Sequence, residues 1–474
     1  MKDNFNAYCN TVWGFRGCIG RLSSPVFVST VFFIFFCFTS NVFGVEDSHL
    51  DASLVKEIDG TSDVEVPAEE IKSLFRQAVL ASFQRSPEVK RALADKSASE
   101  EEVLEAKGQR WPQVNIGAQT KSKEYGEGID NRSSGGWLFT MVTPVYDWGA
   151  IRSAIASREN LAEAAGEQVE AERENAAFNV LSSIINLARY RLIVESSQAY
   201  VNRMQELVTM LSGVVAVDTG RASELTQARA RLLGARGQRD AAEAKSNEEA
   251  INLQKYIGNS NINVPNKSIW GISNPDLNSL LDSIALHPTV KQAKSRSEAA
   301  MLEAKSIRAS TLPSLTWEVS KSTEQDVFAN ETPWQTYISV NWAAFSGGSI
   351  RSAKRAALHR SESQKYEAQF LQRDLEFRIR SANLEGEKAK SRADLYRELV
   401  IETDKVRRDY YQQWYHLGKR TLLDVLTAET GLYDNQVKEI ESRFDAYIAI
   451  IMQYAAAGEL RSWLSIDEIK KPQE

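Results

Sequence analysis

The chain contains two copies of one pattern, and this duplication restricts its fold more than any other feature. Residues 149–154 read GAIRSA and residues 348–353 read GSIRSA. Other matches keep the same order, displaced by about 197 to 201 residues, and pair Pro87 with Pro288, Pro112 with Pro313, Trp137 with Trp334, Gly220 with Gly418, and Gly258 with Gly458. Solenoid repeats are far shorter, roughly 20–50 residues. We interpret the pattern as an ancestral duplication of a whole structural unit.

Each copy includes a long segment without proline, the residue that most strongly breaks helices. Prolines are absent from residues 145–264 and again from 334–471. In the first segment, apolar residues recur at helical spacing, at Leu181, Ile184, Ile185, Ala188 and Leu192. Both segments are therefore expected to be helical.

The first segment is long enough for a helical hairpin. A helix from Ile151 to Leu211 would be about 90 Å long at 1.5 Å per residue. We expect Gly213 and Gly220 to interrupt it, and a second helix to run back to about Ile257.

Alternating segments precede the long helices of each copy. Apolar and polar residues alternate over residues 113–121, and a second strand is expected from 136 to about 145. Residues 67–108 before them read as a helix. The alternation reappears after Pro313. Each copy thus predicts a helix, a strand, a polar loop, a strand and two long helices joined by a turn.

The N-terminus is typical of an export signal. Arg16 and Arg21 precede an apolar run, residues 26–38, that is shorter than the ~20 residues of a membrane-spanning helix. A retained membrane anchor is the alternative. All three cysteines lie in this leader, at Cys9, Cys18 and Cys37. The mature chain is therefore expected to have no disulfides and no thiolate sites.

These interpretations divide the chain into six parts. They are a signal peptide (1–44), a polar lead-in (45–66), a first repeat (67–258), a linker (259–278), a second repeat (279–459) and a C-terminal tail (460–474).

Four strands of about ten residues each suit a tilted crossing of an outer membrane. Open sheet edges cannot face lipid, because their N–H and C=O groups would remain unpaired. Four strands are too few to close a barrel, since the smallest common barrel has about eight. Subunits would therefore share one barrel. A dimer would supply eight strands and a trimer twelve, and only the trimer would leave a wide lumen.

Tryptophans cluster at the expected strands, where we predict an aromatic girdle at the membrane interfaces. They are Trp111, Trp137, Trp148, Trp317, Trp334 and Trp342. The alternative is a soluble β-sandwich that uses these side chains for core packing. The polar loops at residues 122–134 and 322–333 would be extracellular turns.

Several function classes find no support in the sequence. The net charge of −6 lacks the basic footprint of a nucleic-acid binder. The histidines are scattered, and the chain has no His-Glu-x-x-His, Gly-x-Ser-x-Gly or phosphate-binding glycine motif. We expect no enzyme and no cofactor. A periplasmic helical adaptor or a coiled-coil scaffold would share the long helices, but should lack duplicated strands.

Three segments at the turns have distinctive sequences. Residues 415–426, at the second hairpin turn, read YHLGKRTLLDVL, and the segments before the long helices read PVYDWG (144–149) and FSGG (345–348). The first segment strongly resembles the TolC family of outer-membrane efflux and secretion channels, and the other two are similar to the family's Pro-Leu-Phe-Asp-Gly-Gly element. The resemblance implies a mixed α/β membrane protein, a homotrimer whose four strands per subunit form a shared 12-stranded barrel. Long antiparallel helical hairpins would form a periplasmic tunnel.

The resemblance also implies a latch of polar contacts near the hairpin turns that closes the tunnel. The matching positions are Ser223, Glu224, Tyr415, Arg420 and Arg443. Partly buried pairs of this kind contribute about 1–3 kcal/mol. The alternative is that these are exposed helix charges of almost no energetic effect.

Asp424 matches an acidic ring position that lines the constriction in the family, where three copies would favour cations. Two features of the gate region depart from the family pattern. A second acid expected three residues on is Thr427. The spacing from Gly220 to Ala228 in the first turn is also two residues shorter than the spacing from Gly418 to Ala428 in the second turn.

The resemblance implies two partners, a periplasmic adaptor and an inner-membrane transporter, which we expect to be of the ABC type. The energy for export must come from this transporter, since this chain has no nucleotide site. The turn Asp147-Trp148-Gly149 and the tip at 220–223 (GRAS) are similar to the branch that serves type I secretion of large adhesins. We therefore expect protein secretion, with drug efflux as the alternative.

Overall fold

The computed structural model describes residues 65–121, 134–258, 262–323 and 333–466, which all belong to one compact unit. The expected signal peptide and almost all of the lead-in lie outside the described residues. So do nearly all of both polar loops, three linker residues and the end of the tail.

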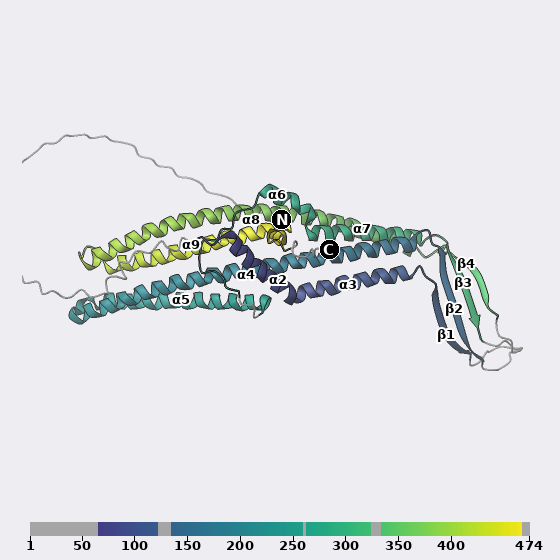
Figure 1. The fold of residues 1–474 in the computed structure, drawn as a ribbon, viewed down its shortest axis with the longest axis horizontal. Helices are drawn as coiled ribbons and strands as arrows, with labels where there is room; N and C mark the ends of the chain where they lie inside the picture. Colours follow the sequence, from purple (N-terminus) through teal and green to yellow (C-terminus); the bar gives the residue numbers. More distant parts are fainter. Residues whose placement is uncertain (1–64, 122–133, 259–261, 324–332, 467–474) are drawn as a thin grey trace, which may run out of the picture. The chain divides into compact units, whose positions relative to one another are not determined.

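The two copies are built from matching elements (Figure 1). The first contains α2 (Ala68–Arg85), α3 (Pro87–Gly108), β1 (Gln113–Lys121), β2 (Ser134–Tyr146), α4 (Ala150–Val217), η2 (Thr219–Arg221) and α5 (Ala222–Ile257). The second contains α6 (Leu277–Ser283), η3 (Ile284–Leu286), α7 (Pro288–Ala309), β3 (Ser314–Ser322), β4 (Gln335–Asn341), α8 (Ser349–Tyr415) and α9 (Leu422–Ala457), followed by α10 (Leu460–Trp463). Because α4 and α8 have 68 and 67 residues, and α5 and α9 have 36 each, the duplication is confirmed.

The single helix expected over residues 67–108 is two helices, α2 and α3. Proline cannot continue a helix, because it lacks the N–H and clashes with the preceding turn. At the first position of a helix it is favourable, and Pro87 occupies that position in α3. Ser86 caps the new helix by accepting a hydrogen bond from the Val89 N–H at 3.3 Å.

The interruption expected at Gly213 is also wrong, since α4 continues through it to Val217. A helical glycine costs roughly 1 kcal/mol relative to alanine. Leu207 and Leu211 beside it are fully buried in an apolar cluster, and this packing outweighs the cost. The turn comes at Asp218, whose side chain accepts the Gly220 N–H at 3.0 Å.

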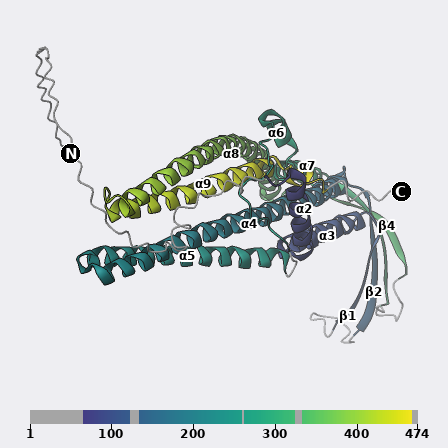
Figure 2. The ribbon, with the colours of Figure 1, turned by 60° about the vertical axis from the view of Figure 1, so that its left-hand side comes forward.

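The long helices pack in a definite order, which Figure 2 shows for the half far from the sheet. Nearer the sheet, α4 packs between α3 and α7, and α7 packs on α8. Farther from it, α4 packs between α5 and α9, and α9 packs on α8. Helices α3 and α5 therefore form one outer side of the unit and α8 forms the other. Among the described residues, no helix has a long enough apolar stretch to cross a membrane.

The core between the copies is centred on Trp270, in the segment expected to be a plain linker. Its ring packs against Phe75, Phe444 and Tyr447 at centroid distances of 6.1, 5.3 and 5.3 Å. The Trp270 N–H donates to the Tyr447 hydroxyl at 2.8 Å. The segment between the copies is therefore part of the core and joins α2 to α9.

Candidate functional site: the sheet and the helical tip

The four strands form one antiparallel sheet in the order β1-β2-β3-β4. Strand β2 of the first copy pairs with β3 of the second, so both copies contribute to the sheet. Pro144 lies in β2 beside a register shift, where a strand tolerates a residue without an N–H. Among the described strands, β1 and β4 each pair on one side only.

The pairing register gives the sheet two different faces. Directly paired residues share a face, so Met141 aligns with Val114 on one side and with Val319 on the other. That face carries Val114, Ile116, Ala118, Trp137, Phe139, Met141, Leu315, Trp317, Val319, Ile338 and Val340, with Thr143, Lys321 and Thr336 as its polar members. The opposite face carries Asn115, Gly117, Thr140, Thr316, Glu318, Ser320, Tyr337 and Ser339, with Leu138 and Val142 as its apolar members.

Among the described residues, no helix packs extensively against the apolar face. Ile116 is 71 % exposed and Ile338 is 66 % exposed. The described strands all belong to one sheet, so the β-sandwich alternative, which requires two packed sheets, is wrong. A continuous apolar surface of this kind marks contact with a membrane or another protein.

Five of the six tryptophans lie toward the ends of the strands, and Trp317 lies within β3. Trp137 and Trp334 lie at the loop end, while Trp111, Trp148 and Trp342 lie where strands meet helices. All six side chains are 43–71 % exposed. From Trp137 to Tyr146, β2 rises about 30 Å, or about 23 Å along the normal at a tilt of about 40°. That height matches the ~25 Å apolar band of outer-membrane barrels.

Far from the sheet, the two helical hairpins pack their ends against each other. Trp414 of α8 and Leu225 of α5 belong to one buried cluster, and the Arg221 guanidinium lies 5.5 Å from the centre of the Trp414 ring. The two turn glycines differ. Gly418 has a left-handed φ of +59°, whereas Gly220 lies in η2 without a positive φ. The unequal turn lengths in the sequence thus correspond to different backbone geometry.

Within one chain, the residues matched to the latch pair with neighbours on their own hairpins. Glu224 binds Arg221 at 2.6 Å. The Arg420 guanidinium lies 4.3 Å from the Tyr410 ring centre, and Tyr415 stacks on Tyr411. Ser223 is exposed. The single chain therefore does not join Glu224 to Tyr415 or Arg420.

The structure places Arg443 away from the other latch positions. It lies 21 residues into α9, about 32 Å from the start of that helix. Its guanidinium binds Glu439 at 2.6 Å and approaches Asp394 of α8 at 3.7 Å. The expectation that Arg443 lies near the turn is wrong. A match to a family position does not place a residue at the turn, because α9 is long and each residue adds 1.5 Å along its axis.

Asp424 has a local role in addition to its expected position at the constriction. It forms a capping box with Thr421 at the start of α9. The hydrogen bond from the Thr421 backbone N–H lowers the pKa of the Asp424 carboxyl, and the Thr421 hydroxyl adds to this effect. The charge at the tip therefore persists to lower pH than that of an ordinary aspartate.

A buried charge cluster near the tip was not predicted from the sequence. Glu429 is 1 % exposed and binds Arg203 of α4 at 2.8 Å and Arg407 of α8 at 3.4 Å. Arg407 also binds Asp404 at 2.8 Å. The available signal was periodicity, because Glu429 lies on the same face of α9 as buried Leu422, Val425, Leu426, Leu432 and Tyr433.

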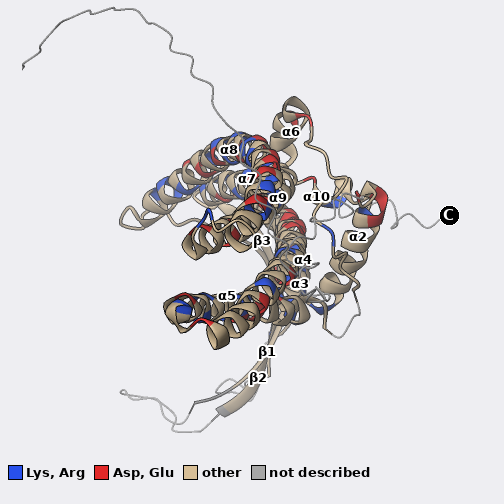
Figure 3. Ribbon diagram, turned by 90° about the vertical axis from the view of Figure 1, so that its left-hand side faces the viewer, with Lys and Arg blue, Asp and Glu red and all other residues tan. Residues whose placement is uncertain are grey.

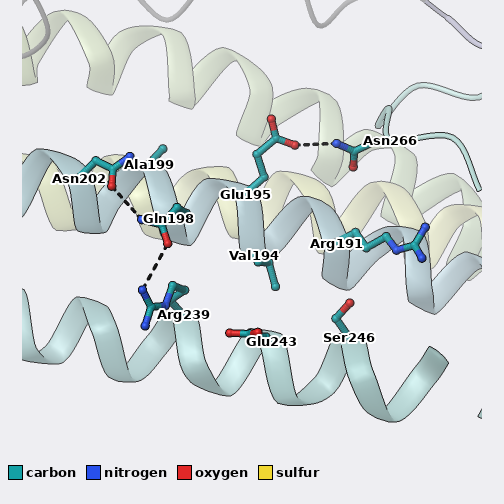
Figure 4. Close-up of a pocket in the computed structure, with 10 residues that line it drawn as sticks. All are labelled: Arg191, Val194, Glu195, Gln198, Ala199, Asn202, Arg239, Glu243, Ser246 and Asn266. Carbon is teal, nitrogen blue, oxygen red and sulfur yellow. Dashed lines mark hydrogen bonds between the residues drawn. The ribbon is translucent and has the colours of Figure 1, made fainter. Parts of the chain in front are cut away.

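A polar groove of about 920 Å³ lies between α4 and α5 (Figure 4). Leucines at Leu225, Leu232 and Leu253 pack α5 on α4, but the intervening positions at the same seven-residue spacing are Arg239 and Ser246. The Arg239 guanidinium donates to the Gln198 carbonyl oxygen at 3.3 Å across the groove. The first hairpin is therefore joined here by polar side chains. The described residues include no cluster of acidic, histidine or cysteine side chains able to hold a metal ion.

A family model described as outer membrane efflux protein matches residues 81–259 and 280–459, one match in each copy. This chain belongs to the outer membrane efflux protein family. The efflux protein BepC of Brucella suis is 20 % identical over 388 residues, covering 81 % of this chain and 85 % of BepC. The adaptor and scaffold alternatives are thereby set aside.

Solved channels share the fold. The CmeC outer membrane channel of Campylobacter jejuni superposes with a TM-score of 0.74 at 14 % identity, covering 88 % of this chain and 95 % of CmeC. The outer membrane protein VceC of Vibrio cholerae gives 0.70 at 16 % identity, covering 81 % and 96 %. The expected fold class is confirmed.

Membership of the outer membrane efflux protein family establishes the general function. The chain is a non-enzymatic channel component of the outer membrane, with a helical tunnel in the periplasm. Channels of this family are trimers that work with an adaptor and an inner-membrane transporter. Figure 3 shows that Lys, Arg, Asp and Glu are distributed along the helices.

Adjacent residues of β3 test which face meets lipid. Val319→Arg places a charge in mid-strand on the apolar face, at a cost of about 2–4 kcal/mol in lipid. We expect it to reduce recovery of assembled protein from outer membranes severalfold. Ser320→Arg, one residue away on the polar face, should assemble normally. Assembly is measured on denaturing gels with and without boiling. Equal recovery of both variants would contradict this assignment of the faces.

Proposed function

We propose that three copies of this chain close into an outer-membrane duct for type I secretion of a large protein. The observation that supports it most is the pair of open edges on the subunit. Strand β1 and helices α3 and α5 form one edge, and β4 and α8 form the other. Three subunits joined edge to edge supply twelve strands.

The open strand edges favour a closed ring over a single pair. In lipid, each unpaired backbone group costs several kcal/mol, so β1 and β4 both require a partner strand. The two edges are different surfaces, and contacts between different surfaces repeat head to tail until the ring closes. Pairing of β4 with β1 of the next subunit would therefore satisfy the backbone N–H and C=O groups of every strand edge.

The helical edges carry exposed apolar residues at matching levels. Leu233 and Ile251 lie 11 and 29 residues beyond the start of α5, and both are exposed. On α8, the exposed Ile401 and Leu384 lie 14 and 31 residues before the helix end. At 1.5 Å per residue, each pair differs in level by less than about 5 Å. We infer that Leu233 meets Ile401, and Ile251 meets Leu384, across subunits.

Cross-linking tests this register. The described residues contain no cysteine, so Leu233→Cys with Ile401→Cys offers defined thiols for a short bis-maleimide. We expect a covalent ladder ending at the trimer, because every subunit contributes one thiol to each of two interfaces. Leu233→Cys with Ile251→Cys, both on the α5 edge, is the matched control and should yield monomers. Monomers from both variants would argue against the ring.

The same arrangement gives the latch a place between subunits. Glu224 lies at the α5 edge, while Tyr415 and Arg420 lie at the end of α8 and in the turn that follows. We propose that these residues, with Ser223, meet across the subunit boundary, where they exchange their partners within one chain for partners on the neighbouring subunit. Arg221 and Arg420 would then compete for the Glu224 carboxylate. Asp424 would line the constriction as a ring of three.

Bilayer recordings test the latch. We expect Tyr415→Phe combined with Arg420→Gln to raise single-channel conductance severalfold, because the contacts that hold the tip closed are lost. In the same recordings, Asp424→Asn should lower cation preference, since an amide oxygen still accepts the Thr421 hydrogen bonds but carries no charge. Asp276→Asn, which removes an equivalent capping charge at α6, is the control and should change neither property.

The cargo proposal rests on the turn and tip sequences. Asp147 caps α4 by accepting the Ile151 N–H at 2.6 Å, and Trp148 takes a left-handed φ of +55°. The Trp148 indole N–H donates to the Pro313 carbonyl at 2.9 Å, which holds this strained residue in place. Hydrogen bonds thus hold the Asp-Trp-Gly turn in a defined conformation at the junction between the sheet and the helices. Energy for export would come from an ABC-type transporter joined through an adaptor.

Gene deletion separates the two cargo classes. We expect loss of the chain to remove a large surface protein, detected in whole-cell and culture-medium fractions, and to leave drug susceptibility within twofold. Complementation with the wild-type chain should restore the surface protein. Increased susceptibility with unchanged surface proteins would favour drug efflux, and the name of BepC describes an efflux protein.

A further inference from the structure

The second copy has a buried histidine at the joint between the start of α7 and the end of α9. His287 is 7 % exposed and lies at the N-cap position of α7. In the first copy the same position is Ser86, which caps α3. The other histidines of the described residues, His359 and His416, are exposed. Among those residues, His287 is therefore the histidine whose protonation would disturb a packed contact. We call its contact with the end of α9 the histidine joint.

Both ring nitrogens of His287 have hydrogen-bond partners. Nδ1 accepts the backbone N–H of Thr289 at 3.2 Å, so it carries no proton. The Thr289 hydroxyl lies 2.8 Å from the same nitrogen. A neutral imidazole then carries its proton on Nε2, and the ring bonds the backbone of Ala455 in the last turn of α9. The neutral ring thereby joins the start of α7 to the end of α9.

The ring also packs tightly on the turn that ends α9. Gly458 follows this helix with a left-handed φ of +73°, and its N–H donates to the Ala455 carbonyl at 3.1 Å. A Cβ at position 458 would lie only 2.9 Å from Cδ2 of His287 and 3.1 Å from Cδ of Pro288. The histidine joint therefore leaves no space there for even a methyl group.

A proton added to His287 would work against this arrangement. It would bind Nδ1, where it would face the Thr289 N–H, donor against donor. The Thr289 hydroxyl can turn to accept it, but the backbone N–H would still lose its acceptor, and an unpaired buried donor is costly. A positive charge at the start of a helix is also disfavoured by the helix dipole. The neutral ring is therefore the form that fits the closed joint.

The surrounding charges do not compensate the added charge. Arg378 of α8 acts on His287, and its positive charge disfavours a second one. Other charged side chains on the neighbouring elements act elsewhere: Asp374 of α8 binds Arg378 at 2.7 Å, Glu459 binds the Ser283 hydroxyl, Lys291 of α7 acts on Glu167 of α4, and Asp282 of α6 is exposed. Burial of the ring is the largest cause that lowers the pKa of His287, and Arg378 adds to it, whereas the hydrogen bond to Ala455 opposes both.

We propose that the histidine joint is a proton-sensitive lock, which holds α7 against α9 at neutral pH and releases it in acid. Because the pKa of His287 is lower in the closed joint than its ordinary value, an open joint binds the proton more readily. The closed joint therefore keeps its full stability above about pH 6.5 and loses it progressively as the pH falls below that value.

The first copy offers the same joint without the titrating group. The Ser86 hydroxyl accepts the Val89 N–H at 3.3 Å and does not titrate in this range. We therefore expect the first-copy joint to be indifferent to pH. This inference goes beyond the proposed secretion duct and does not depend on it.

Hydrogen exchange read by mass spectrometry tests the lock on the assembled full chain at about pH 7.5 and about pH 5.5. Exchange times are scaled to give equal chemical exchange at both values. Peptides covering residues 284–292 and 452–458 report the histidine joint, and peptides covering 82–91 and 251–258 report the first-copy joint. We expect acid to increase opening of the histidine joint severalfold and to leave the first-copy joint unchanged.

Two substitutions assign this response to His287. His287→Asn keeps a side-chain acceptor for the Thr289 N–H, and His287→Ser copies the cap of the first copy. Neither side chain titrates near neutral pH, so the ratio of opening at the two pH values should fall to about one. That ratio stays informative where a substitution also loosens the joint at both values. His359→Asn, at an exposed histidine, is the matched control and should keep the wild-type response.

Three outcomes would overturn the proposal. The first is a wild-type histidine joint that opens equally at both pH values. The second is equal loosening of both joints in acid, which would mean that the whole subunit responds to pH. The third is a wild-type pH response that persists in His287→Asn and His287→Ser, since another group would then carry it.

Discussion

The outer edges of β1 and β4, with which no described strand pairs, are the constraint from which the rest of the arrangement follows. Backbone N–H and C=O groups cannot remain unpaired in lipid, so a four-stranded sheet with one apolar face is stable there only as part of a larger closed sheet. The helices obey the same geometry, because α5 and α8 lie on the same two outer sides as β1 and β4. Closure of the ring therefore pairs the strand edges and the helical edges at the same time. A subunit alone would leave both kinds of edge without a partner.

A second principle is that some contacts between the helices are permanent, whereas others can exchange their partners. The region around Trp270 is apolar and brings α2, α4, α9 and the segment between the copies into one core. Toward the tip, the contacts become polar, with Glu429, Arg203 and Arg407 buried between α4, α8 and α9. Buried ion pairs add little net stability, but they define specific partners. A duct that must stay assembled and still open needs both kinds of contact at different levels.

Much of the fold could be predicted from the sequence, and the misses have physical reasons. The duplication, the strand alternation and the proline-free helices were sufficient for the fold class. Gly213 was wrongly expected to end α4, because buried neighbours outweigh the modest helix penalty of glycine. Ser86 and Pro87 were overlooked as a boundary, although proline favours the first position of a new helix. The segment around Trp270 gave no periodic signal, since one aromatic side chain anchors it.

The sequence by itself determined the order of the strands and long helices, the alternation of the strands and the family, because periodicity and turn residues act locally along the chain. Only the tertiary structure decided which charged side chains meet. Glu224 pairs with Arg221 within its own hairpin, Arg443 lies far from the tip, and Glu429 is buried between two arginines. The Arg203–Glu429 pair joins positions 226 residues apart. Their partners depend on how helices about 100 Å long are aligned, which no local pattern specifies.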